Sequence, residues 1–112
     1  MKNKLYILWT NADPITSEKM VCMYAKNALL NNWWDDVTII VWGATVQYLA
    51  SDASIQKEIK DIINCGVHVS ACRSCVEQLK LLENIDALGI HHQYWGEALS
   101  SLIKGPHKLI TI

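Results

Sequence analysis

Two kinds of apolar pattern alternate along this chain, and their order predicts a succession of strands and helices. Short, nearly continuous apolar runs are typical of strands that are buried on both faces of a sheet. The predicted strands cover residues 5–9, 37–42, 67–71, 90–94 and 109–112. The second of these is the most strongly β-forming, because it is apolar and largely β-branched.

The segments between the strands carry helical signals. Asp13 and Pro14 suit an N-cap and a first helical position, and the apolar positions that follow extend this helix to residue 31 or 32. Isoleucines at helical spacing predict a helix that starts at 51 or 52 and ends at 64, with Gly66 where a left-handed glycine closes a helix. Further helices are expected around 46–50, through Val76, Leu79 and Leu82, and over 96–104.

Strands separated by helices pair in parallel, with helices on both faces of the sheet. We therefore expect an α/β fold, a three-layer α/β/α sandwich with a mostly parallel five-stranded sheet. The chain has 112 residues, of which 51% are hydrophobic and 19% charged. This is the size and composition of one ordered domain, and we expect a single domain over residues 1–112.

The net charge and the hydropathy pattern limit which binding partners and which cellular compartment are expected. The net charge of −1 leaves no basic excess, so we expect no nucleic acid and no anionic membrane surface as partner. No apolar run approaches the ~20 residues of a membrane span, and the first apolar run is too short for a signal peptide. The chain is therefore expected in the cytoplasm, where thiols are more often catalytic, metal-binding or buried than bridged.

Ligands of parallel α/β sheets bind outside the carboxyl ends of the strands. The segments that leave those ends here are 9–11, 42–45, 71–72 and 95–97. The candidate binding residues on them are Asn11, Gly43, Thr45, Gly96 and Glu97. Five tryptophans are present: 33, 34 and 42 are expected in the core, while 9 and 95 are open between core, site and subunit interface.

Cys72 stands where the third strand meets the next helix, and it is the predicted catalytic thiol. A helix N-terminus favours the thiolate and lowers a thiol pKa, and Arg73 is expected to add to this effect. Cys75 lies one turn further on, where it can resolve a disulfide, accept sulfur or face the core. Cys22 and Cys65 are expected to be structural.

A zinc site must be weighed, because Cys65, His68, Cys72 and Cys75 have a superficially suitable spacing. The strand between His68 and Cys72 would separate them by roughly 13 Å, too far for shared coordination. His91, His92 and His107 are expected at the opposite edge, where their strands begin. We therefore expect no metal ion and no cofactor.

The chain resembles the DsrE-like sulfur-relay family along nearly its whole length. The resemblance rests on the opening strand with residues 11–14, the strand at 37–43, the segment 66–72, the step at 88–90, residues 96–99 and the closing strand. It implies that Cys72 carries sulfur as a persulfide. Cys75 is shared with a subgroup of small uncharacterised relatives only. The resemblance also implies assembly as trimers or hexamers.

Three functions stay open at this point. The first is a persulfide carrier, similar to a sulfurtransferase, in which Cys72 takes sulfur from a protein donor and passes it to an acceptor. Arg73 and the helix N–H groups would then stabilise the thiolate, and Thr45 and Glu97 would line the site. The second is a dithiol redox protein that uses Cys72 and Cys75. The third is a non-enzymatic oligomeric module that binds a small ligand or partner.

Overall fold

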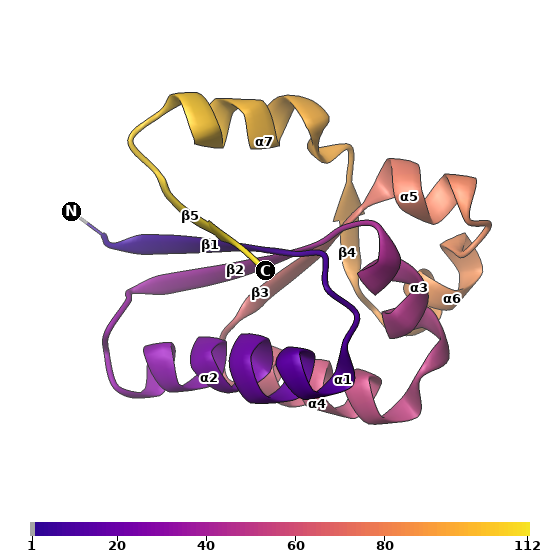
Figure 1. Cartoon of the computed structure of the whole chain (residues 1–112), viewed down its shortest axis with the longest axis horizontal. Coiled ribbons are helices and arrows are strands. Elements are labelled where there is room, and N and C mark those ends of the chain that lie inside the picture. Colours follow the sequence, from indigo (N-terminus) through magenta and orange to yellow (C-terminus); the bar gives the residue numbers. More distant parts are fainter. Residues whose placement is uncertain (1) are drawn as a thin grey trace.

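Five parallel strands form the centre of the molecule, and the computed structural model describes residues 2–112 (Figure 1). The strands are β1 (Lys4–Trp9), β2 (Asp36–Val41), β3 (His68–Cys72), β4 (His91–Gln93) and β5 (Lys108–Thr111). Their order across the sheet is β4-β3-β2-β1-β5, and every pair is parallel. The expected sheet is confirmed, and it is entirely parallel.

Helices cover both faces of this sheet and gather beside the carboxyl ends of its strands. They are α1 (Pro14–Thr16), the π-helix η1 (Ser17–Cys22), α2 (Met23–Leu30), α3 (Ala44–Ser51), α4 (Ala53–Asn64), α5 (Arg73–Gln78), α6 (Leu82–Ala87) and α7 (Trp95–Lys104). The α1–η1–α2 rod and α4 lie on one face, and α7 lies on the other (Figure 1). The three-layer architecture is therefore confirmed.

The core is divided unequally between the two faces. The larger cluster packs the strands against η1, α2, α3 and α4, and it includes Leu5, Ile7 and Trp9 of β1. The smaller cluster lies under α7 and consists of Ile40, Trp95 and Leu102, with partly buried neighbours. One helix, α7, thus covers one face of the sheet, whereas the α1–η1–α2 segment and α4 together cover the other.

The first helix begins as its sequence predicts. The Asp13 side chain accepts a hydrogen bond from the Thr16 N–H at 2.9 Å, and Pro14 occupies the first turn. This backbone donor lowers the pKa of the Asp13 carboxyl. The helical path continues to Leu30, but its middle turns, from Ser17 to Cys22, are wider than an α-helix. The pattern of apolar residues did not reveal this widening.

The segment after β3 differs from its prediction. One helix was expected through Val76, Leu79 and Leu82, and the structure has two short ones. Lys80 has a φ of +58°, which a continuous right-handed helix does not allow. The Leu81 N–H reaches back to the Val76 carbonyl at 2.8 Å, which closes α5 before α6 starts.

The position expected for two histidines is wrong. His91 and His92 do begin β4, but this strand has only three residues, so its start lies close to its carboxyl end. The register pairs His91 with Ser70 and His92 with Ala71. Both histidines therefore lie level with the second half of β3, and Gln93 is the residue that pairs with Cys72.

The tryptophans differ in burial, and composition did not indicate which of them are buried and which are exposed. Trp9 and Trp95 are buried: Trp9 belongs to the larger core cluster, and Trp95 packs in the smaller one and also borders a groove described below. Trp33 was expected in the core but is 56% exposed, because it follows the end of α2 at the surface. Among residues 2–112, no helix has both the length and the apolar character needed to cross a membrane.

Candidate thiol site

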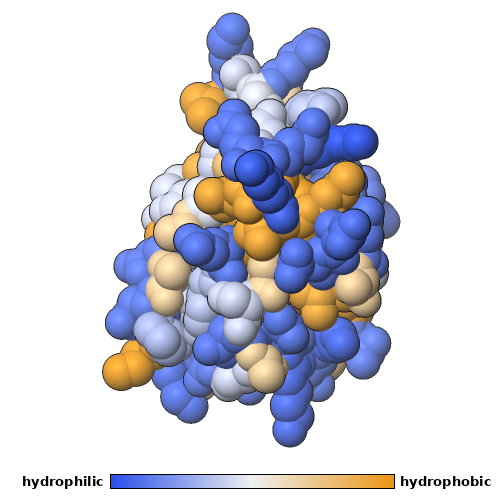
Figure 2. All heavy atoms as spheres, turned by 90° about the vertical axis from the view of Figure 1, so that its right-hand side faces the viewer, coloured by the Kyte–Doolittle hydropathy of each residue, from blue (hydrophilic) through white to orange (hydrophobic). Residues whose placement is uncertain are grey.

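The carboxyl ends of the strands meet on one side of the molecule, where α3, α5 and α7 begin (Figure 1). Figure 2 looks directly onto this side. Apolar side chains gather in its upper half, and polar side chains surround them. An apolar area with a polar border at this edge suits a binding surface.

Cys72 ends β3 and caps α5, with an extended backbone at φ −66° and ψ 110°. Only 2% of the residue is exposed. Burial raises the pKa of the Cys72 thiol, and the backbone N–H groups of Cys75 and Ser74 act in the opposite direction. The expected lowering of this pKa is therefore wrong: the helix start supplies the predicted donors, but desolvation outweighs them.

Cys75 is partly exposed on the first turns of α5. Its thiol lies near the Cys72 thiol, and this neighbour contributes to the raised pKa of Cys72. Both thiols are free, and the pair is consistent with a C-x-x-C arrangement. The site therefore combines a buried thiol with a more accessible neighbour.

Arg73 does not act on Cys72 in the expected way. Its Nε lies 3.6 Å from the Glu77 carboxylate, and its guanidinium carbon lies 5.4 Å from the centre of the Tyr94 ring. The Tyr94 hydroxyl donates a hydrogen bond to the same carboxylate. These three residues form a surface cluster that joins α5 to the end of β4, and we call it the Arg73 cluster.

Thr45 is buried beneath the edge. Its hydroxyl donates to the Trp9 carbonyl at 2.7 Å and accepts from the Trp42 N–H at 3.1 Å. This hydroxyl therefore ties the ends of β1 and β2 together. Gly43 precedes it with φ +70° and ψ −129°, a conformation that only glycine adopts easily.

The other predicted binding residues lie on neighbouring strand ends. The Asn11 side-chain oxygen accepts from the Asp13 N–H at 2.9 Å, which shapes the turn after β1. Gly96 and Glu97 are exposed in the first turn of α7. Their roles in binding stay predictions.

A polar chain on the same face as Cys72 was missed from sequence. Ser70 Oγ lies 2.7 Å from His91 Nδ1, and the Trp95 indole N–H donates to Ser70 Oγ at 2.9 Å. Alternation along β3 places Ser70 on the same face as Cys72. The register between β3 and β4 pairs His91 with Ser70. This register could not be inferred from the pattern of apolar residues.

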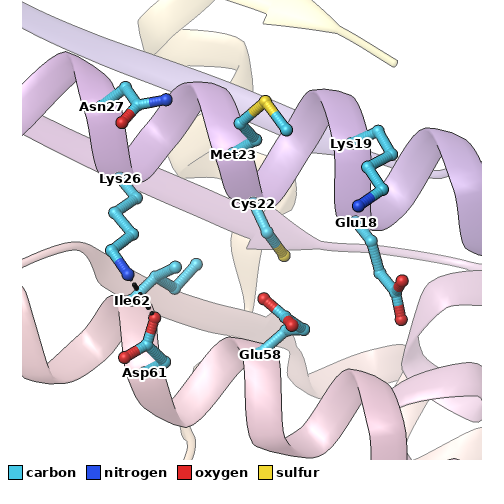
Figure 3. Close-up of a pocket in the computed structure, with 9 residues that line it drawn as sticks. All are labelled: Glu18, Lys19, Cys22, Met23, Lys26, Asn27, Glu58, Asp61 and Ile62. Atoms are coloured by element: carbon cyan, nitrogen blue, oxygen red, sulfur yellow. Dashed lines mark hydrogen bonds and ion pairs between the residues drawn. The ribbon is translucent and has the colours of Figure 1, made fainter.

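Cys22 occupies a different hollow, between η1 and α4 (Figure 3). It is 1% exposed, which confirms the expectation of a core residue. Burial, with a smaller contribution from the nearby Glu58 carboxylate, raises the pKa of Cys22 to about 12. Lys26 and Asp61 close one side of this hollow with an ion pair of 2.8 Å.

The solved structures that match this chain include a relative and a more distant fold neighbour. No protein-family model matches the chain, and no curated protein matches it significantly. It is similar to a solved structure of a conserved protein of unknown function, BT1422 from Bacteroides thetaiotaomicron. The identity is 36%, with 98% of this chain and 95% of that chain covered, and the TM-score is 0.95.

The ychN protein from E. coli has the same fold at a greater distance. Its crystal structure matches with a TM-score of 0.72 over 100% of both chains, at 16% identity. This likeness shows that the two chains share one α/β fold. At 36% identity over nearly its full length, the chain belongs to the same family of conserved proteins as BT1422.

Proposed function

We propose that this protein transfers sulfur, and that Cys72 carries the sulfur as a persulfide. The main support is the position of this free thiol at the end of β3 and the start of α5. Two backbone N–H groups there oppose the effect of burial on the pKa of Cys72. The DsrE/YchN-like fold and the resemblance to sulfur-relay proteins support the same function.

The chemistry is two exchange steps without net oxidation. The Cys72 thiolate attacks the terminal sulfur of a donor persulfide, R–S–SH. A sulfur–sulfur bond forms to Cys72, the donor's sulfur–sulfur bond breaks, and the donor leaves as its thiolate. A thiolate of the acceptor then attacks the terminal sulfur of Cys72–S–SH, and the Cys72 thiolate leaves.

Burial of Cys72 affects both steps. A buried persulfide is shielded from water and from thiols other than that of the acceptor, which suits a sulfur carrier. The raised pKa also keeps much of the resting thiol protonated, so loading is expected to accelerate as the pH rises. Donor and acceptor proteins, and assembly of several copies of the chain, are part of this proposal.

The test is intact-mass spectrometry after incubation with a small persulfide donor. Wild type is expected to gain sulfur, and Cys72→Ala is expected to lose this gain. Cys22→Ala is the matched control, because it removes another buried thiol and should leave loading intact. An adduct that persists in Cys72→Ala would refute the proposal.

The contact between the two thiols favours a second function, dithiol redox exchange. Here the Cys72 and Cys75 thiols give two electrons and two protons to a substrate disulfide, which is reduced to two thiols while an internal disulfide forms. Cys75→Ser separates the alternatives: it abolishes this cycle but leaves Cys72 able to accept sulfur. Equilibration with glutathione buffers measures the cycle directly.

A further inference from the structure

A second concave site lies along β3 and β4, between the start of α7 and the end of α4. It is a groove of about 520 Å³, within the size range of small-molecule sites. The Trp95 ring at the start of α7 borders it, and Ile63 at the end of α4 lies at its other side. None of the thiols lines this groove, so it is separate from the site proposed above.

The polar groups of the groove are organised around Ser70, which is only 6% exposed. An indole N–H only donates, so the Ser70 oxygen accepts from Trp95. The single hydroxyl proton of Ser70 is then free to point at His91 Nδ1, 2.7 Å away. This arrangement satisfies every donor when neutral His91 carries its own proton on Nε2.

The fixed tautomer gives the groove an oriented donor. His91 is exposed, so its Nε2–H is available to a ligand, and the buried Trp95–Ser70 pair holds the ring in place. Such a preorganised donor loses little entropy when it binds an acceptor.

The charged and polar groups that line the groove indicate the charge of the ligand it can bind. Its titratable side chains are two imidazoles, His68 and His91, and Thr38 adds a hydroxyl. No carboxylate and no lysine or arginine lines the groove. The remaining lining is mainly apolar, including Ile63 and Val67. An anion meets no repulsion here, and a charged imidazole would attract it.

We propose that this groove binds a small organic carboxylate with an apolar body, held by the Nε2–H of His91. The apolar body lies against Ile63 and Trp95, and the carboxylate accepts from His91. This inference does not depend on sulfur transfer, because it uses a different set of side chains.

The test is a titration with benzoate, followed by ¹H–¹⁵N NMR. The indole N–H signal of Trp95 and the amide signals of Ser70 and His91 are expected to shift saturably. Benzamide, a neutral molecule of the same shape, is expected to bind about tenfold more weakly or worse. If benzoate gives no saturable shift, or if benzamide binds equally well, the proposal is overturned.

Substitutions test whether His91 is the residue that holds the carboxylate. His91→Gln is expected to weaken benzoate about tenfold, because the charged acceptor loses its fixed donor. His107→Gln is the matched control, since His107 packs against Tyr6 and does not line the groove. Equal affinity of His91→Gln and wild type would contradict the proposal. Should His91→Gln fail to fold, Ser70→Ala, which releases the ring, is expected to weaken binding in the same direction.

Discussion

Cys72 and Cys22 are both buried thiols of the same chain, yet their surroundings differ in kind. Cys22 faces the Glu58 and Glu18 carboxylates from within η1, and both carboxylates raise its pKa further after burial has done so. Cys72 meets backbone N–H donors at the start of α5, and these oppose burial. Burial alone therefore does not distinguish the two thiols, whereas the backbone N–H donors that oppose burial at Cys72 alone do.

The largest expected contrast between the two is the rate of alkylation. At pH 8, a thiol with a pKa of about 12 is ionised in only about one molecule in ten thousand. In a Cys75→Ser background, iodoacetamide is expected to modify Cys72 faster than Cys22, because backbone N–H groups oppose the effect of burial only at Cys72. Peptide mass spectrometry over time measures both rates. Equal rates would mean that local opening, and not ionisation, controls both thiols.

Serine substitutions are expected to separate the two positions by stability. Cys22→Ser places a hydroxyl in an apolar core beside carboxylates, at a cost of about 1–2 kcal/mol. Cys72→Ser places serine at an N-cap, where its oxygen can accept the backbone N–H groups, so the change is expected to stay within about 0.5 kcal/mol. Urea unfolding of the two variants and wild type measures this. A larger loss for Cys72→Ser would show that the N–H groups do not serve this position.

The pH dependence of stability sharpens the same contrast. The folded pKa of Cys22 lies above its ordinary value of 9.0, so the thiol ionises first in the unfolded chain. Its contribution is complete below pH 9 and is lost as pH rises from 9 to 12, by about 1 kcal/mol per pH unit. Wild type is therefore expected to lose stability faster over this range than Cys22→Ala. Parallel curves for the two proteins would contradict the raised pKa of Cys22.

The smallest expected effect concerns the Arg73 cluster beside Cys72. Tyr94→Phe removes the hydrogen bond to Glu77 and keeps an aromatic ring under Arg73. The cluster lies at the surface, where charge interactions are weak, so alkylation of Cys72 is expected to change by less than about threefold. The rate at Cys22 should not change. A tenfold change at Cys72 would show that this cluster controls access to the thiol.

The local parts of this structure were predictable from sequence. Asp13 and Pro14 start a helix because their capping chemistry lies within a few residues. Gly66, with φ +109°, ends α4 as its position indicated. Cys72 was placed at the corner between β3 and α5 because a strand pattern ends there. Each of these signals depends on neighbours along the chain.

The parts that failed depend on distant contacts. The sign of the Cys72 pKa shift is set by how deeply the corner is buried, which the residues around it do not specify. His91 reaches Ser70 because the register pairs these two residues, and apolar spacing does not give strand register. The split between α5 and α6 is a local exception: the Leu81 N–H bonds to the Val76 carbonyl, and the left-handed turn between the helices has Lys80 where glycine would have signalled it.

The most direct measurement is the location of transferred sulfur in the wild-type protein. After incubation with a small persulfide donor and rapid alkylation, tandem mass spectrometry of the digested chain shows which cysteine holds the additional sulfur. The account predicts that it is on Cys72. Sulfur that first appears on Cys22, Cys65 or Cys75, with none on Cys72, would contradict it.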